Sequence, residues 1–154
     1  MAKTSLLDKP PVAVTVDVSP RRFGMADLND MGPWLMERLQ KKFPHLHSRM
    51  LSGWFAGAMG SNEFLFLRTD NACGMAVMTN NPMQEQPVVT EVFVLSRNGD
   101  LNEAAAFYPA FRRWAKQIGA SEIVIERFSD VPHEIVRDVV GSRVLIRESM
   151  FVRV

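Results

Sequence analysis

The alternation of apolar and polar residues divides the chain into short strands and longer amphipathic helices. Apolar runs and period-two alternation predict strands over residues 12–18, 63–69, 72–79, 88–95 and 121–128. Apolar residues spaced three or four apart predict helices over residues 25–43, 47–59, 101–119 and 131–140. A turn is expected over residues 19–24, and one or two closing strands over residues 142–154. The predicted order is therefore β-α-α-β-β-β-α-β-α-β(-β).

Glycine, proline and asparagine mark the expected breaks in these elements. Gly32 and Pro33 lie inside the first helix and are expected to bend or split it. Asp70 and Asn71 separate two strands by two residues, which predicts a hairpin. The strand–helix–strand unit over residues 88–127 predicts a right-handed crossover between parallel neighbours. The fold class is therefore α/β in the broad sense, an α+β mixed sheet that is strongly twisted and has helices on both faces.

Composition is that of an ordinary soluble globular domain. The 154 residues include 47% hydrophobic and 23% charged residues, which is typical of a single globular domain. We expect a flexible N-terminal arm over residues 1–11 and one domain over residues 12–154. A formal net charge of +1 gives no electrostatic reason to expect a nucleic-acid or membrane partner.

Cysteine and histidine usage argues against disulfide and metal chemistry. Cys73 is the only cysteine, which excludes an internal disulfide and a cysteine-based zinc site. It also fits a reducing compartment, so we expect a cytoplasmic protein. His45 and His47 stand two residues apart with no third ligand nearby, so no metal site is predicted. No apolar run is long enough to predict a transmembrane helix, and the N-terminus lacks a signal-peptide core.

Residues 111–126 read FRRWAKQIGASEIVIE, a helix end with Trp-Ala, then a glycine, then a β-branched strand. This pattern, together with the element order from residue 12 to residue 154, resembles the GNAT family of acetyl-coenzyme A dependent N-acetyltransferases. The resemblance implies a GNAT-like fold that transfers an acetyl group to an amine acceptor, either a small molecule or a protein. Acetyl-CoA is then the expected cofactor.

The resemblance assigns residues 99–104 to the cofactor loop, which in the family reads Gln/Arg-x-x-Gly-x-Gly/Ala. Ala104 matches the last position. Asn102 stands where the family has glycine, and asparagine suits that position because it tolerates a left-handed backbone. Gly99 replaces a long basic or amide side chain, so Arg97 would reach the phosphates only if the loop shifted in register. The family's backbone contacts map onto Val92, Phe93 and Val94 for the pantetheine arm, and onto the amides of Asn102, Glu103 and Ala104 for the pyrophosphate.

The residues of this loop also support a different interpretation. Asp100 and Glu103 have the spacing of a helix capping box. In that arrangement Asp100 accepts hydrogen bonds from the first free amides of the helix, which are the groups that a pyrophosphate would use. Its carboxylate would also repel a diphosphate. The alternative function is therefore a catalytically inactive GNAT-like fold that acts as a protein-interaction or assembly module, with a protein partner or a homo-oligomer.

One acidic residue on the central strand is the candidate catalytic group. Glu91 lies in a valine-rich run, and several members of the resembled family use a glutamate at this place as the general base. The competing interpretation is a carboxylate at the sheet edge or at the mouth of a cleft. The position of the family's proton-donating tyrosine holds Arg137, and Tyr108 is expected in the core.

The second predicted helix contains a candidate binding surface. Trp54 and Phe55 stand beside several small residues, and in the resembled fold this helix lines the acceptor groove. We expect the pair to form either an acceptor floor or an exposed protein-contact patch. Simple packing of both side chains onto the sheet is the alternative that the sequence leaves open.

Overall fold

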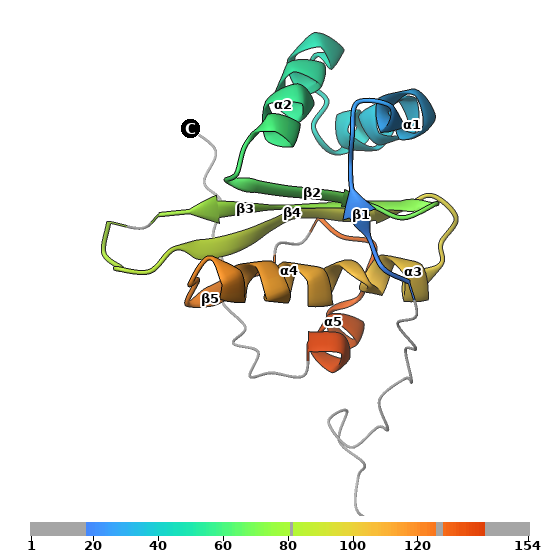
Figure 1. Ribbon diagram of the computed structural model, residues 1–154. Helices are drawn as coiled ribbons and strands as arrows, with labels where there is room; N and C mark the ends of the chain where they lie inside the picture. Colours follow the sequence, from blue (N-terminus) through green and yellow to red (C-terminus); the bar gives the residue numbers. More distant parts are fainter. Residues whose placement is uncertain (1–17, 81, 126–127, 141–154) are drawn as a thin grey trace, which may run out of the picture.

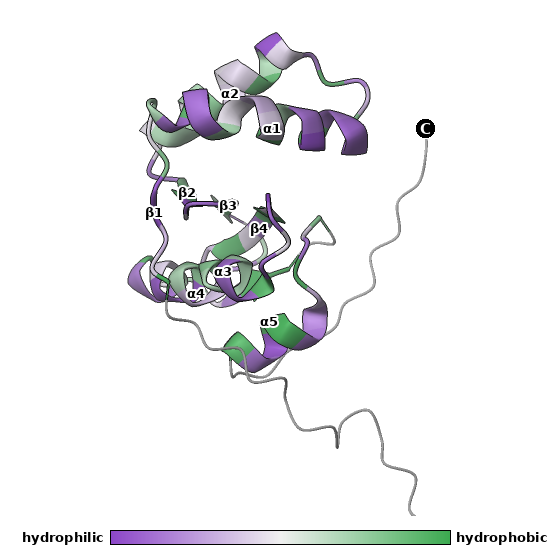
Figure 2. Ribbon diagram, turned by 90° about the vertical axis from the view of Figure 1, so that its right-hand side faces the viewer, coloured by the Kyte–Doolittle hydropathy of each residue, from purple (hydrophilic) through white to green (hydrophobic). Residues whose placement is uncertain are grey.

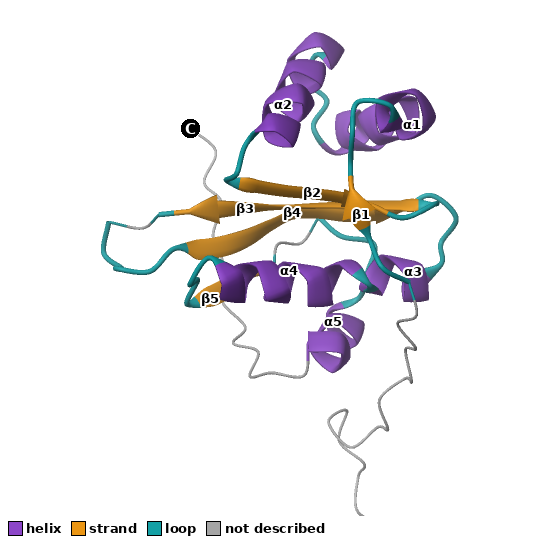
Figure 3. Ribbon diagram, viewed as in Figure 1, coloured by secondary structure: helices purple, strands orange, loops and turns teal. Residues whose placement is uncertain are grey.

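The computed structural model describes residues 18–80, 82–125 and 128–140. A five-stranded sheet runs through its centre (Figures 1 and 3). The strands, in sheet order, are β1 (Arg21–Arg22), β2 (Phe64–Arg68), β3 (Ala72–Thr79), β4 (Val88–Ser96) and β5 (Glu122–Val124). The helices are α1 (Asp27–Lys42), α2 (Ser48–Gly60), α3 (Leu101–Ala105), α4 (Phe107–Gln117) and α5 (His133–Val140). In the turned view, α1 and α2 lie on one face of the sheet, and α3, α4 and α5 lie on the other (Figure 2).

The sheet is mixed, as the sequence predicts. Strands β1 to β4 pair antiparallel in sequence order. Strand β5 pairs in parallel with β4, and Val88 lies opposite Glu122. Helices α3 and α4 connect these two parallel strands (Figure 1). The predicted parallel neighbours over residues 88–95 and 121–128 are therefore confirmed, although β5 is shorter than expected.

Each face of the sheet buries its own apolar cluster. One cluster, under α1 and α2, includes Phe55 and Phe93. The other cluster, under α3, α4 and α5, includes Phe107 and Phe111. Since both faces are covered, the central strands read as nearly continuous apolar runs rather than as a strict alternation of apolar and polar residues.

The long helix expected over residues 101–119 is instead two helices, α3 and α4, which are separated at Ala106. Pro109 explains the break, because it has no amide hydrogen to bond the Ala105 carbonyl and its ring would clash with that carbonyl. In the observed structure Pro109 lies in the first turn of α4, where a missing amide leaves no hydrogen bond unmade.

Helix α1 is continuous through Gly32 and Pro33, so of the two expected outcomes, a bend or a split, the split is wrong. Pro33 lies on the exposed side of the helix. Met31 and Leu35, on the two sides of the proline, are both completely buried. Packing of this apolar stripe on the sheet therefore outweighs the hydrogen bond that Pro33 cannot make. The helices expected over residues 47–59 and 131–140 are confirmed as α2 and α5.

The turn expected over residues 19–24 contains the edge strand β1 instead. Its two arginines pair antiparallel with Arg68 and Leu67. The Phe23 amide extends the pairing by donating to the Phe66 carbonyl at 2.9 Å. The predicted arm over residues 1–11, the predicted strand up to residue 17 and the closing strands over residues 142–154 lie outside the described residues.

Candidate functional site

Strand β4 positions the candidate catalytic residue through an irregularity in its pairing with β3. Phe93 lies opposite Met75, but Glu91 lies opposite the next residue of β3, Ala76. Val92 is therefore the extra residue of a β-bulge. The bulge turns both Val92 and Phe93 toward the cluster under α1 and α2. Glu91 is left on the opposite face, beside α4.

Glu91 is completely buried, with 0% of its surface exposed. Its burial contradicts the interpretation as an exposed carboxylate at the mouth of a cleft. The pairing of β4 with β5 covers residues 88–90 and ends one residue before Glu91. Burial, followed by the nearby charge of Glu91, raises the pKa of Tyr108 well above its usual range. The hydroxyl groups of Tyr108 and Ser129 are hydrogen bonded at 2.7 Å. Tyr108 is only 1% exposed, so its expected place in the core is confirmed.

In the loop between β4 and α3, the residue with a left-handed backbone is Gly99 and not Asn102, which the sequence analysis expected. Gly99 has a φ of 77°. Asn102 is instead a helical residue in the first turn of α3, and no residue other than glycine has a positive φ in the described ranges. The left-handed role expected for Asn102 is therefore wrong, because the helix starts two residues after the glycine turn.

The amides of this loop are largely bonded within the protein. Six of them, from residue 97 to residue 104, donate to protein oxygen atoms. These are the amides of Arg97 to the Asn71 carbonyl (2.6 Å), Gly99 to the Ser96 hydroxyl (2.9 Å), Asp100 to the Asn98 side chain (3.0 Å), Asn102 and Glu103 to the Asp100 carboxylate (3.0 and 3.3 Å), and Ala104 to the Asp100 carbonyl (3.1 Å). The groups that would bind a pyrophosphate therefore already have acceptors.

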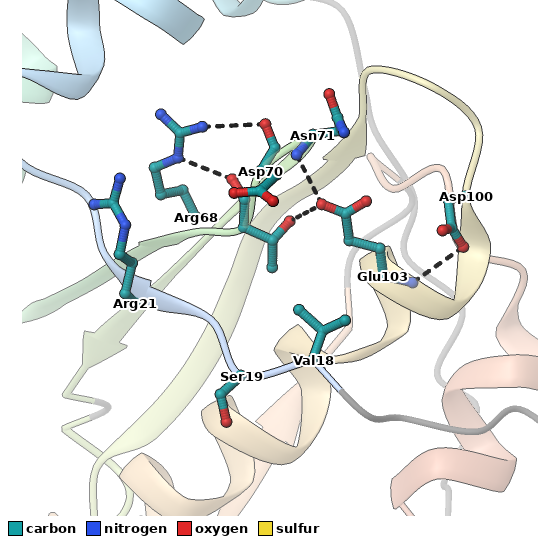
Figure 4. A pocket seen from close by; sticks show the side chains of 9 residues that line it. Val18, Ser19, Arg21, Arg68, Asp70, Asn71, Asp100 and Glu103 are labelled. Atoms are coloured by element: carbon teal, nitrogen blue, oxygen red, sulfur yellow. Dashed lines mark hydrogen bonds between the residues drawn. The ribbon is translucent and has the colours of Figure 1, made fainter.

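Asp100 caps α3, as the sequence predicts. Glu103, however, does not complete the capping box. Its Oε1 accepts hydrogen bonds from the Thr69 hydroxyl at 2.5 Å and from the Asn71 amide at 2.7 Å (Figure 4). Glu103 is 8% exposed, so this carboxylate anchors the start of α3 to the hairpin between β2 and β3 rather than to its own helix.

The Arg97 side chain is held by α1 and by the hairpin. Its guanidinium donates to the Asp30 carboxylate at 2.9 Å and to the Asp70 carbonyl at 2.8 Å. Hydrogen bonds from Arg97, and then from Arg68, lower the pKa of Asp30. In this conformation both terminal nitrogens of Arg97 are bonded to protein oxygen atoms, so a contact with a phosphate would require the shift in loop register and stays a prediction.

Asp130 lies beside the last residues of β4, beyond the part of β4 that pairs with β5. The Asp130 amide donates to the Val94 carbonyl at 2.9 Å. Its carboxylate accepts from the Ser96 amide at 2.9 Å and forms a bidentate pair with Arg38 of α1 at 2.6 and 3.1 Å. Ser129 adds an isolated parallel bridge to Val94. Backbone groups of β4 at Val94 and Ser96 are thus bonded to this segment.

A polar cavity of about 250 Å³ opens beside the start of α3 (Figure 4). It is lined by Val18, Ser19, Arg21, Arg68, Thr69, Asp70, Asn71, Asp100 and Glu103. Arg68 is ion-paired to Asp27 at 3.0 Å and to Asp30 at 2.8 Å. In the described ranges, no group of three or more His, Cys, Asp or Glu side chains is placed to hold a metal ion.

The two aromatic residues of α2 lie in different environments. Trp54 is 37% exposed, whereas Phe55 is only 1% exposed and packs with Leu51 and Ala58 against the sheet. The expectation that both side chains form a surface is therefore wrong for Phe55. Successive residues of a helix are about 100° apart, so a neighbour of a buried position readily faces solvent.

The structure is similar to solved structures along most of its length. No family model matches the sequence, and no curated protein matches it. The structure matches an aminoglycoside 6'-N-acetyltransferase from Acinetobacter haemolyticus at 14% identity, covering 88% of this chain and 98% of that chain, with a TM-score of 0.59. It also matches a GNAT family acetyltransferase from Staphylococcus aureus at 8% identity, with 87% and 96% coverage and a TM-score of 0.58. The chain has the GNAT fold.

A third similar structure holds a bisubstrate analogue. The aminoglycoside acetyltransferase AAC(6')-Iy, in complex with a bisubstrate analogue of coenzyme A and acetylneamine, matches at 13% identity and a TM-score of 0.59. The match covers 88% of this chain and 97% of that one. These similarities extend along most of both chains, so the GNAT fold inferred from the element order is confirmed. None of the helices in the described part of the chain is long and apolar enough to cross a membrane.

Proposed function

We propose that this chain is a GNAT-fold domain that does not hold acetyl-CoA on residues 97–104 and instead works by binding another protein. The observation that supports this most directly is the occupation of the loop amides, above all by the Asp100 carboxylate. A pyrophosphate would have to displace this carboxylate. If Asp100 stayed about 4 Å away, each unit of phosphate charge would be repelled by roughly 4 kcal/mol at an effective dielectric constant near 20.

Asp130 supports the same proposal from the other end of the expected cofactor path. By resemblance, the pantetheine arm would run along Val92, Phe93 and Val94. The Val94 carbonyl already accepts the Asp130 amide, and the Ser96 amide already donates to the Asp130 carboxylate. Arg38 holds that carboxylate with two hydrogen bonds. A cofactor would have to break this set of bonds in addition to the Asp100 cap.

Calorimetric titration of acetyl-CoA tests the proposal. The unaltered protein is expected to bind more weakly than about 1 mM, which corresponds to about −4 kcal/mol. Asp100→Ser retains a neutral cap, while Asp100→Gly frees the amides of Asn102 and Glu103. Binding should increase in the order Asp, Ser, Gly if the carboxylate is the obstacle. Micromolar binding by the unaltered protein would overturn the proposal.

The second candidate function is N-acyl transfer from acetyl-CoA to an amine. It is favoured by one specific observation, the buried carboxylate of Glu91 beside a β-bulge and near Tyr108. In this mechanism the amine nitrogen attacks the thioester carbonyl, the carbon–sulfur bond breaks, and the thiolate leaves. Glu91 would take the amine proton directly or through a water molecule.

Release of free thiol measures this activity. Acetyl-CoA would be supplied with an aminoglycoside, with a polyamine and with a lysine-containing peptide, in separate reactions. The binding-module proposal expects no thiol release above the rate without protein. If release occurs and Glu91→Gln abolishes it without lowering the melting temperature, the enzyme function replaces the binding function.

A further inference from the structure

The exposed side of α2 carries large apolar side chains and glycines, which is unusual for a solvent-facing helix surface. Met50 is 63% exposed and Trp54 is 37% exposed, one turn apart. Gly53 and Gly57 lie on the same side, at helical spacing, and a Cβ built on either would have no heavy atom within 4 Å. Glycine in an exposed helix is destabilising relative to alanine. Neither glycine is required by a contact within the described residues.

The helix also lacks the usual stabilising features at its ends. The side chain of its N-cap residue, His47, makes no capping hydrogen bond. Its first turn has no acidic residue and its last turn has no basic residue to complement the helix dipole. The sequence of α2 is therefore poorly suited to an isolated helix. A helix backbone exposed by glycine can be approached closely by a second helix, at an interaxial distance near the lower end of the usual 8–10 Å.

The segment that leads from the end of α1 through α2, between Glu37 and Glu63, carries basic but no acidic side chains. From Arg38 to Asn62 the sequence has no aspartate or glutamate, although the chain contains 17 such residues. The same stretch contains four lysines and arginines and two histidines. Lys42 and Arg49 are exposed, as is Phe43 at 45%. Arg38 and Lys41 are ion-paired to Asp130 and Glu37. The basic character of the surface that leads into α2 therefore comes from Lys42 and Arg49.

The exposed apolar, glycine and basic residues together suggest the chemistry of a partner. We propose that α2 docks an amphipathic helix of another protein, one whose apolar stripe contacts Met50 and Trp54 and whose flanking acidic residues face Arg49 and Lys42. The proposal rests on the binding role proposed above and gives it a place and a partner class. Such docking is the packing of one helix on the exposed face of another. Complementary charge would set the orientation and the rate of association.

Two other occupants fit less well. A second copy of this chain, packing α2 against α2, would bring the same basic residues together. An anionic lipid surface would satisfy the charge, but it would not make use of the close backbone approach that Gly53 and Gly57 permit. Both alternatives are separate outcomes of the experiment below.

The test uses a synthetic 18-residue helical peptide with leucines along one stripe and glutamates elsewhere, labelled for fluorescence anisotropy. A matched peptide replaces every glutamate with lysine. The full-length protein is expected to bind the acidic peptide and to bind the basic peptide at least tenfold more weakly. Trp54→Ala and Arg49→Glu should each weaken binding of the acidic peptide about tenfold or more. Lys116→Glu, a charge reversal at another exposed position, on α4, is the control and should change binding less than twofold.

The decisive variant is Gly57→Leu. If Gly57 has no role in docking and only lowers the stability of the helix, Gly57→Leu raises the melting temperature and leaves peptide binding unchanged. That result would overturn the proposal. If α2 is a docking face, leucine raises or preserves the melting temperature while weakening peptide binding tenfold or more. Equal binding of the acidic and basic peptides would also overturn it.

The alternative occupants are measured in parallel. Binding to vesicles of phosphatidylglycerol and phosphatidylcholine, but not to the acidic peptide, would assign α2 to a lipid surface. Concentration-dependent dimerisation that Gly57→Leu abolishes, seen by sedimentation, would assign it to a second copy. Either result would overturn the proposed partner. Acyl-transfer activity would overturn the proposed function without altering peptide binding, so the two failures can be distinguished.

Discussion

Replacing Gly74 with alanine is expected to destabilise the protein strongly. Gly74 lies in β3, and a Cβ built there would come within 2.6 Å of Cδ1 and 3.0 Å of Cγ of Phe107. Phe107 is completely buried at the start of α4. The strand is held by neighbours on both sides, so neither group moves freely. We therefore place the cost at the upper end of the range for overpacking, about 3 kcal/mol.

This cost should be visible in thermal and urea unfolding followed by circular dichroism. In a domain of this size, each kcal/mol shifts the melting temperature by about 2–4 °C, so Gly74→Ala should lower it by roughly 6–12 °C. Gly57→Ala is the matched control. Its added methyl group meets no heavy atom within 4 Å, so helix propensity alone should stabilise the protein by up to about 1 kcal/mol.

A double-mutant cycle separates the steric contact from other causes. Phe107→Leu removes part of the ring that Gly74→Ala would meet. The loss in the double variant should therefore be smaller than the sum of the two single losses by about 1 kcal/mol or more. If Gly74→Ala unfolds within about 0.5 kcal/mol of the parent, or if the two losses add, the packing argument for the start of α4 is refuted.

Three further predictions concern buried polar groups. Hydrogen bonds from Arg21, together with the Gly24 amide, hold the pKa of Asp27 well below its usual range. The resulting stabilisation of the folded protein is complete above the pKa of Asp27 in the unfolded chain, and it is lost as the pH falls toward the pKa in the folded protein. Asp27→Asn should therefore lower the melting temperature more at pH 7 than at pH 2. Burial raises the pKa of Cys73 far above its usual range, so a thiol reagent at pH 8 should modify it only after denaturation. Tyr108→Phe removes the hydrogen bond to the Ser129 hydroxyl and should lower the free energy of unfolding in urea by about 1 kcal/mol. An unchanged urea midpoint would contradict a stabilising role for that bond.

The parts of the fold that follow from short-range physics were accessible from the sequence. The order of helices and strands follows from apolar periodicity, and the cap of α3 by Asp100 follows from the spacing of two polar residues at a helix start. Gly99 has the positive φ that glycine permits most readily. The break at Ala106 was also accessible, because Pro109 is in the sequence, but the continuous apolar stripe from Leu101 to Ile118 concealed it.

The side chains that depend on distant partners were not accessible. Arg97 is adjacent to the loop in sequence, yet its guanidinium binds Asp30, which is 67 residues away. Glu103 has the spacing of a capping box, yet it binds Thr69 and Asn71 across the hairpin. In both cases a long side chain with several acceptors or donors in reach follows tertiary packing rather than local spacing. No local pattern distinguishes the two outcomes.

The role of Asp130 bears most directly on function, and it is the one that local sequence could least reveal. Asp130 lies 34 residues from Ser96 and 92 from Arg38. The chain after β5 brings Asp130 beside Ser96 of β4, and the packing of α1 brings Arg38 to it. Its bonds and the Asp100 cap involve different atoms at different ends of the path expected for the cofactor. Relieving one would leave the other intact. The inference that this GNAT fold does not hold acetyl-CoA therefore rests on two sets of contacts, so Asp100→Gly is expected to raise the affinity for acetyl-CoA only in part, because the Asp130 contacts with Val94 and Ser96 remain.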